Sequence, residues 1–468
     1  MAASRCSRSA RRLALLMLLS SRGLAAEPAR HAELNALLGS GNMLGRAPVE
    51  PAFWEGLGSL RSGRGNRARF DGSLREPGIV RDFEASVRLR LELGLDRIGE
   101  GSSPTLGDAS SFVQLAWRSN GGARLSLRAY PLDTDYVRIG YLHALDWGGT
   151  QVAARESVFL ARRPGAPGIL LALESSRLRL FAGAKWSAAG DALPGSRRRW
   201  GAFGGGSLRL AAALRFELGL GFFEREAGFV EGASARWVLH RDATEPELAA
   251  EPFRAPPLRD DPERLDAEAP RGAALALEGT LLVVRAPNQP KLATAPAAAL
   301  YGSVRGAVVA AHLAITCRSL AFVLRNDARY AAESYAAAES APEQPELAAW
   351  LGGSARLHRT ELVPSFEVGV RLPATLFTPS SLPGLAQVWV ASGTAGLTPL
   401  PLGTGRLPLW AARLALRWQA SASVALLLSG DYQRDPNRTR LRPSGSEIVR
   451  ASDAASTFEI VSGFQARW

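Results

Sequence analysis

Hydrophobic and polar residues alternate one by one along much of this chain. In the clearest stretch, residues 82–96, apolar side chains take every second position and charged ones such as Arg88 and Arg90 lie between them. A period of two places the two kinds of side chain on opposite faces of an extended strand. The pattern returns over 207–223, with a turn expected near 211–213. The sequence therefore predicts long strands with one apolar and one polar face.

The alternating segments are longer than the strands of soluble domains. They span roughly 10 to 14 residues, against about five or six in soluble sheets, and this length suits a tilted strand that crosses hydrocarbon. After the amino-terminal segment, no uninterrupted apolar run is long enough for a spanning helix. We therefore expect an all-β fold over residues 81–468, a transmembrane antiparallel up-and-down β-barrel of about 16 to 18 strands.

Aromatic residues favour the ends of the predicted strands. Their rings are apolar with one polar group, so they suit the two interfaces of a membrane. The residues in such positions are Trp117, Tyr130, Trp147, Trp186, Trp200, Trp237, Trp389 and Trp418. The alternative interpretation is a soluble sandwich in which these aromatics cap an ordinary core.

The predicted connections alternate in length, as barrel topology requires. Short ones fall at 119–122, 175–176, 211–213, 360 and 420–422, and longer polar ones at 99–109, 188–196, 328–345, 373–385 and 436–456. Short turns belong on the periplasmic side and long loops outside. A Pro-rich acidic stretch, 244–272, leaves the strand count open because it could contain one degenerate strand.

The amino end has the features of a secretory signal. Several arginines precede an apolar run at 13–19 and small residues near 23–26. We expect residues 1–26 to be cleaved, which leaves Cys317 as the one cysteine of the mature chain. Residues 27–80 contain Gly, Pro and Arg with one weakly helical piece, and we expect a periplasmic or plug-like segment there.

The last residues alternate again and end on an aromatic side chain. Phe458, Ile460, Phe464 and Trp468 lie on one face of this segment. It resembles the closing strand and assembly signal of bacterial outer-membrane β-barrels. The resemblance implies an outer-membrane location, with insertion by the outer-membrane assembly machinery among lipid and lipopolysaccharide.

Several phrases are also similar to uncharacterised outer-membrane barrel proteins of the myxobacterial type. They are scattered over most of the mature chain at 77–83, 129–131, 135–141, 144–150, 435–439 and 465–467. The similarity implies a barrel and its compartment, without a substrate or functional residues. Residues 244–272 depart most from those proteins.

The sequence gives little support for a catalytic or metal-binding site. The histidines His143, His240, His312 and His358 do not fall at metal-ligand spacing. Residues 201–206 contain several glycines without a phosphate-loop lysine, so tight packing of strands explains them better. The acids of 260–268 lack the pattern of a calcium loop. We therefore predict no enzyme, no metal, no cofactor and no nucleic-acid partner.

The polar face of the predicted strands is mostly basic. The predicted channel-lining residues are Arg88, Arg90, Arg124, Arg128, Arg138, Arg177, Arg179, Lys185, Arg209, Arg215, Arg371, Arg413 and Arg417. Fewer acids share that face, namely Glu84, Glu92, Glu217, Glu367 and Asp431. Fixed positive charge in a narrow pore enriches anions. Alternatively, arginine–carboxylate pairs fill the lumen and nothing passes.

Three functions are compatible with these patterns. We expect a porin-like outer-membrane channel for passive passage of small solutes, with a mild preference for anions. The runner-up is a closed barrel that acts as a structural or adhesion scaffold through its extracellular loops. A barrel lipid hydrolase comes third because no nucleophile constellation can be named.

Overall fold

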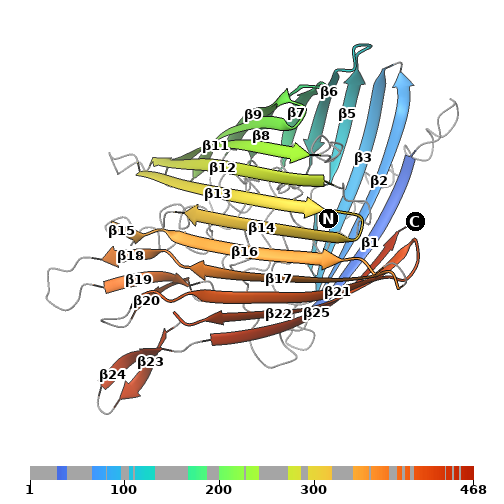
Figure 1. Ribbon diagram of the computed structural model, residues 1–468. Coiled ribbons are helices and arrows are strands. Elements are labelled where there is room, and N and C mark those ends of the chain that lie inside the picture. Colours follow the sequence, from blue (N-terminus) through green and yellow to red (C-terminus); the bar gives the residue numbers. More distant parts are fainter. Residues whose placement is uncertain are drawn as a thin grey trace, which may run out of the picture.

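The alternating segments form one large antiparallel sheet in the computed structural model (Figure 1). The structure describes residues 29–39, 66–80, 82–95, 105–108, 111–131, 167–186, 200–225, 228–241, 272–285, 293–318, 341–357, 360–378, 387–392, 396–400, 405–437, 439–444, 447–452 and 455–467. The predicted signal, 1–26, lies outside these residues. Among them, no helix is long and apolar enough to cross a membrane.

Within the described residues, nineteen strands form the wall. They are β1 (Ala29–Gly39), β2 (Asn66–Val80), β3 (Phe83–Leu95), β4 (Thr105–Asp108), β5 (Phe112–Arg118), β6 (Arg124–Tyr130), β7 (Gly168–Glu174), β8 (Leu178–Trp186), β9 (Trp200–Ala211), β10 (Leu214–Arg225), β11 (Gly228–Arg241), β12 (Gly272–Arg285), β13 (Ala293–Arg305), β14 (Val309–Arg318), β16 (Glu346–Ala355), β17 (Leu362–Leu372), β21 (Leu409–Gln419), β22 (Val424–Asp435) and β25 (Ala455–Arg467). Because β4 and β5 pair with successive parts of β3, the nineteen strands fill eighteen positions.

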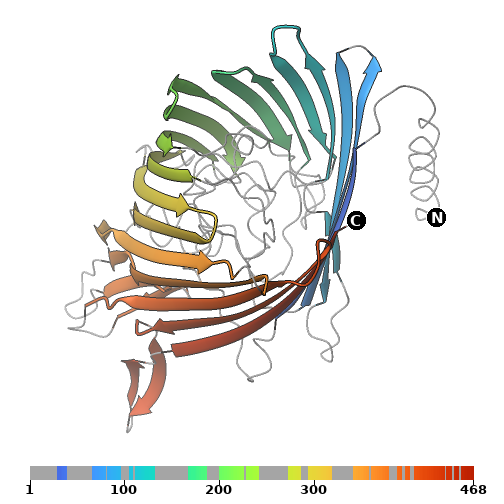
Figure 2. The ribbon, with the colours of Figure 1, turned by 45° about the vertical axis from the view of Figure 1, so that its right-hand side comes forward.

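The sheet closes where its first and last strands meet. β1 pairs with β2 on one side and with β25 on the other, so that Leu34 lies opposite both Phe70 and Ala466. Figure 2 shows blue β1 beside red β25 as the strands curve round into a barrel. Closure removes the open edges that hydrocarbon does not tolerate. The predicted all-β barrel is confirmed.

One boundary of the prediction is wrong. Residues 27–80 were expected to form a plug or periplasmic segment, but Ala29–Gly39 and Asn66–Val80 are the wall strands β1 and β2. The weakly helical piece of the sequence analysis is residues 31–38, which lie in β1. A short apolar run is compatible with the period of a helix as well as with that of a strand, so its pattern does not separate the two. The missed signal is the strict alternation of polar and apolar residues over 67–75.

The two faces of the wall differ in the way that the sequence predicts. Leu218 and Leu416 are each 41% exposed on the outer face, whereas the adjacent Glu217 and Arg417 are less exposed on the inner face. The outside is therefore apolar and the inside is polar. A sheet with this arrangement suits lipid around it and water within it.

Tryptophans mark both ends of the outer face. Within the described residues, the exposed ones are Trp117, Trp237 and Trp418 towards the short turns and Trp186, Trp200 and Trp410 towards the long loops. Tyr130 was predicted at the membrane interface, but it is buried on the inner face, where it accepts a hydrogen bond from Arg128. Trp389 lies outside the wall, in β19 (Gln387–Ser392), and Trp147 lies outside the described residues.

The short connections lie where the sequence places them. The turn at 119–122 closes with Ser119 N donating to Ala123 O at 2.8 Å, and Gly122 there has a φ of 80°, which favours glycine. The connections at 175–176 and 420–422 are also tight turns of the same end. Residues 242–271, which join β11 to β12, lie outside the described residues.

Two small sheets extend beyond the wall at the long-loop end (Figure 1). The first contains β15 (Ala341–Gln344), β18 (Thr375–Thr378), β19 and β20 (Gly396–Pro399), and the second contains β23 (Thr439–Ser444) and β24 (Glu447–Ser452). The sequence predicts loops where β15, β18, β23 and β24 lie. The difference arises because β15 and β18 prolong the hairpin of β16 and β17, so that their pairing continues past the wall.

Polar side chains fix these extensions to the rim. Arg406 Nη1 donates hydrogen bonds to the carbonyl oxygens of Pro345 at 2.5 Å and Pro373 at 3.0 Å. Asn437 binds the backbone of Leu407 twice, accepting from its N–H at 2.7 Å and donating to its carbonyl at 2.8 Å. The long-loop end therefore contains ordered structure anchored to the barrel.

Candidate functional site

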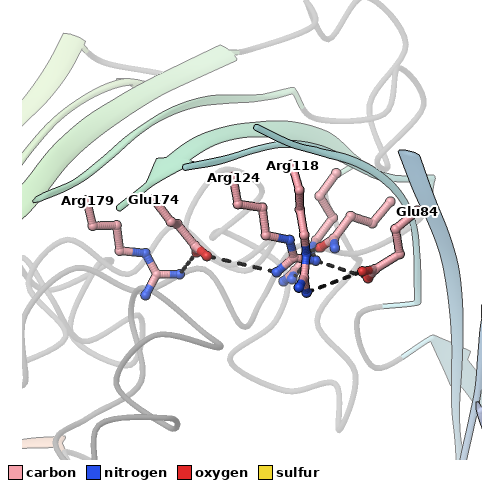
Figure 3. A network of polar contacts seen from close by, with 7 residues as sticks. Glu84, Arg118, Arg124, Glu174 and Arg179 are labelled. Carbon is pink, nitrogen blue, oxygen red and sulfur yellow. Dashed lines mark hydrogen bonds and ion pairs between the residues drawn. The ribbon is translucent and has the colours of Figure 1, made fainter. Parts of the chain in front are cut away.

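A chain of ion pairs crosses the inner face of β3, β5, β6, β7 and β8 (Figure 3). Arg118 Nη2 lies 3.5 Å and Arg124 Nη2 lies 3.2 Å from the carboxylate of Glu84. Glu174 lies between two arginines, with Oε2 at 3.9 Å from Arg124 Nη1 and Oε1 at 2.5 Å from Arg179 Nη2. Acids and bases therefore alternate along this part of the wall.

A second network lies on the inner face of β10, β11 and β12. Arg215 Nη2 is 2.7 Å from Glu217 Oε1, and Arg236 donates to the other oxygen of the same carboxylate. Arg236 also lies 4.0 Å from Glu278, which accepts a hydrogen bond from Thr280. One carboxylate therefore bridges two guanidinium groups, and one guanidinium bridges two carboxylates.

A third network lies further round the wall, on β14, β16 and β17. Glu346, which is 1% exposed, accepts from Arg318 Nε at 2.9 Å and lies 3.7 Å from Arg371 Nη1. Removing two charges from water costs several kcal/mol per ion unless partners and hydrogen bonds replace the solvent. Flanking arginines on both neighbouring strands provide that replacement for Glu346.

Strand register explains why these groups meet. Residues directly opposite in an antiparallel pair share a face with their Cβ atoms about 5 Å apart. The opposed charged pairs are Arg124 with Glu174, Glu174 with Arg179, Glu217 with Arg236, Arg236 with Glu278, and Arg318 with Glu346. Ser207 opposes both Arg179 and Glu217, so it lies between the first and second networks.

Arg128 has a different environment, made of neutral groups. Its Nε and Nη2 donate to Gln114 Oε1 at 2.9 and 2.7 Å, and Nη1 donates to Tyr130 Oη at 3.2 Å. The guanidinium also lies 4.2 Å from the ring centroid of Phe112, within cation–π range. This side chain therefore carries positive charge on the inner wall beside an amide and two aromatic rings.

Phenylalanine rings cover glycines next to this basic region. A Cβ on Gly183 would lie 2.3 Å from Phe203, and one on Gly205 would lie 2.6 Å from Phe181. The rings can lie against the sheet only because these positions lack side chains. Lys185, 1% exposed, lies with its Nζ 6.0 Å from the ring centroid of Phe203. The glycines of 201–206 are therefore explained by close packing, as the sequence suggests.

The structure brings many of the predicted lining residues to the inner face. Those that are buried or half-buried there are Arg88, Arg124, Arg128, Arg179, Lys185, Arg209, Arg215, Arg371, Arg413 and Arg417. Arg177 is exposed in the turn between β7 and β8 and is not part of a strand. Arg90 lies in β3, with its side chain outside what the structure describes, and Arg138 lies outside the described residues.

The sequence missed three of the five glutamates in these networks. Glu174, Glu278 and Glu346 each bind arginines on the inner face, as does Glu217, which was predicted. Their position in the alternation is the signal that could have found them, because each has apolar neighbours that point outward. Arg318 was missed for the same reason.

The terminal segment lies in the closing strand. Phe458, Ile460 and Phe464 of β25 are 46, 42 and 39% exposed on the outer face. Trp468 lies outside the described residues. The predicted apolar face of the segment therefore points away from the lumen.

The histidines do not assemble a metal site in the part of the chain that the structure describes. His240 and His312 are buried on the inner face, and the described residues contain no cluster of three or more potential ligands. His143, and the acids of 260–268 considered as a calcium loop, lie outside the described residues.

Comparisons with known proteins support the architecture. No protein-family model matches the chain, and no curated protein matches its sequence. Among solved structures, Acinetobacter baumannii OccAB1 is similar with a TM-score of 0.50 and 11% identity, covering 96% of this chain and 98% of that one. Acinetobacter baumannii OccAB3 gives 0.49 and 7%, covering 95% and 100%, and Pseudomonas aeruginosa OccK3 gives 0.47 and 11%, covering 94% and 96%. At this identity the likeness concerns the fold alone, which is that of an outer-membrane β-barrel.

Proposed function

We propose that the barrel is a porin-like channel for passive passage of small solutes. The observation that carries the proposal is a closed wall with an apolar outside and a charged, hydrogen-bonding inside. Such a face solvates polar solutes while the outer face remains in lipid. The fold likeness to OccAB1 is compatible with this function, and it does not identify a solute.

A mild preference for anions is part of the proposal. In the three ion-pair networks, seven arginines face five glutamates, and Arg128 and Lys185 add two further cations on the same wall. Because most of the charge is paired, the net field is smaller than the predicted arginine face alone would produce. Fixed charge of one sign raises the local concentration of the opposite ion.

The second candidate is a closed barrel that serves as a scaffold. The extensive pairing of acids and bases across neighbouring strands favours it, because such networks stabilise a wall without any passage. The ordered sheet β15–β18–β19–β20 at the long-loop end would then form the working surface. A lipid hydrolase is the third candidate function. We also propose that the assembly machinery and lipopolysaccharide are partners of the barrel. The similarity to myxobacterial-type barrel proteins stays a prediction from the sequence.

Conductance in planar bilayers tests these candidates. Purified, refolded protein should give stepwise currents, with a reversal potential in a salt gradient that indicates mild anion preference. Heat-modifiable migration in gel electrophoresis shows whether the barrel is folded. A folded barrel that gives no current would refute the channel and support the scaffold. We expect no release of fatty acid from phospholipid. Such release would instead identify a hydrolase.

A further inference from the structure

A groove interrupts the apolar outer face near the short-turn end of β11 to β16. It has a volume of about 620 Å³ and apolar walls. Five outward residues form a row across neighbouring strands there, namely Leu239, Leu275, Gly302, Leu313 and Leu351. The four leucines are 52, 47, 42 and 47% exposed. Gly302 has no side chain, so the row has a gap at its centre.

The gap is open space in the wall surface. A Cβ built on Gly302 would meet only Leu275 Cδ1, at 3.7 Å, which is an ordinary contact distance. A larger side chain would therefore extend into the groove and would not collide with the backbone. Many glycines of the inner wall differ, since their missing Cβ atoms would clash with neighbours.

The position of the groove identifies its occupant. The row lies on the face that points into hydrocarbon, so that a lipid chain is the apolar molecule in contact with it. Arg241 lines the same groove two residues beyond Leu239, nearer the rim, and is exposed on the outer face. Arginines near membrane interfaces extend towards headgroups, where they bind phosphate. Apolar and cationic parts are therefore arranged as in a phospholipid.

We propose that this groove binds one acyl chain of a glycerophospholipid of the periplasmic leaflet, with Arg241 contacting its phosphate. The periplasmic leaflet follows from the short connections 306–308 and 356–361, which lie at this end of the barrel. The driving force is close packing. An acyl chain that moves from the surrounding lipid into the groove leaves one apolar environment for another, so the hydrophobic effect does not contribute. The proposal depends on the barrel fold and not on conduction, so it stands or falls independently of the channel.

Photo-crosslinking tests the site. The wild-type protein is refolded in vesicles containing a phosphatidylglycerol with a photoreactive group in its acyl chain, and labelled peptides are mapped by mass spectrometry. We expect labelling concentrated on β11–β14 and β16. Gly302→Leu should reduce it roughly tenfold, since on the order of ten carbon contacts are lost. The matched control is Gly279→Leu on the outer face of β12, where a Cβ meets nothing within 4 Å and so fits without a clash, as at Gly302, and it should keep the label.

A headgroup arm separates the phosphate contact from the chain contact. In the wild type, unlabelled phosphatidylglycerol should reduce photolabelling more than diacylglycerol with the same acyl chains. In Arg241→Gln, the two competitors should reduce photolabelling equally. Equal labelling of Gly302→Leu and Gly279→Leu would overturn the proposal. A dimer that a separate bifunctional protein crosslinker captures in the wild type and that is lost in Gly302→Leu would also overturn it, because it would assign the groove to a second copy. If Gly302→Leu fails to insert, an unchanged headgroup preference in Arg241→Gln refutes the site.

Discussion

Replacing Glu346 with glutamine tests whether buried ion pairs stabilise the inner wall. This carboxylate lies on β16 between Arg318 on β14 and Arg371 on β17 and is 1% exposed. Glutamine has nearly the same shape but no charge, so two guanidinium groups would face each other across one strand without the anion between them. The change therefore removes the attraction and leaves the cost of burying the cations.

The expected magnitude follows from burial. Breaking a buried pair by removing one partner costs about 3–5 kcal/mol, whereas exposed pairs contribute about 0.2–1 kcal/mol. The chain contains a matched control in Arg356 and Glu361, whose atoms lie 2.8 Å apart with side chains 36 and 44% exposed. We expect Glu346→Gln to lower the free energy of unfolding by about 3 kcal/mol and Glu361→Gln by less than about 1 kcal/mol.

Urea titration in phospholipid vesicles measures this difference. Tryptophan fluorescence follows the transition, and migration before and after heating confirms that the barrel has formed. Losses that are equal and below about 1 kcal/mol in both variants would contradict the reasoning, because Glu346 would then behave as a solvated group. If the folded variant conducts, its loss of one negative charge should also increase the preference for anions.

Three further predictions concern insertion, register and selectivity. Phe464→Asp places an acid on the lipid face of β25 and should prevent insertion, so normal amounts of heat-modifiable protein in membranes would contradict it. A cysteine at Glu217 should react with a water-soluble thiol reagent and one at Leu218 should not, with Cys317 replaced in both, and equal reaction would show a wrong register. Arg128→Gln should shift the reversal potential towards cations, most clearly in dilute salt because the screening length is about 10 Å at 0.1 M, and an unchanged potential would exclude Arg128 from the conducting path.

The parts of the fold that the sequence predicts are those with a local cause. The period of two fixes which face each residue takes, so Leu218 is exposed and Glu217 is turned inward, as expected. Turn chemistry is equally local, and Gly122 occupies the positive φ that its turn requires. The facing of residues within the strands and the positions of the short connections were therefore accessible from the chain alone.

The parts that escaped prediction depend on distant pairing. β1 is a strand because β2 and β25 provide partners on both sides, and its own residues fit a helix as well as a strand. The small sheet beyond the rim has the same origin, since β15 and β18 continue a hairpin that begins within the wall. Periodicity within one segment contains no information about the neighbour that completes it.

Pairing across strands also changes the meaning of the basic residues. Taken from the sequence, Arg124, Arg179 and Arg215 belong to a single positive face, but the register brings Glu174 and Glu217 against them. An acid and a base in contact act at a distance as a dipole, whose field falls faster than that of a single charge. Selectivity should therefore depend on the cations in excess over their acids, while the paired groups mainly hold neighbouring strands in register.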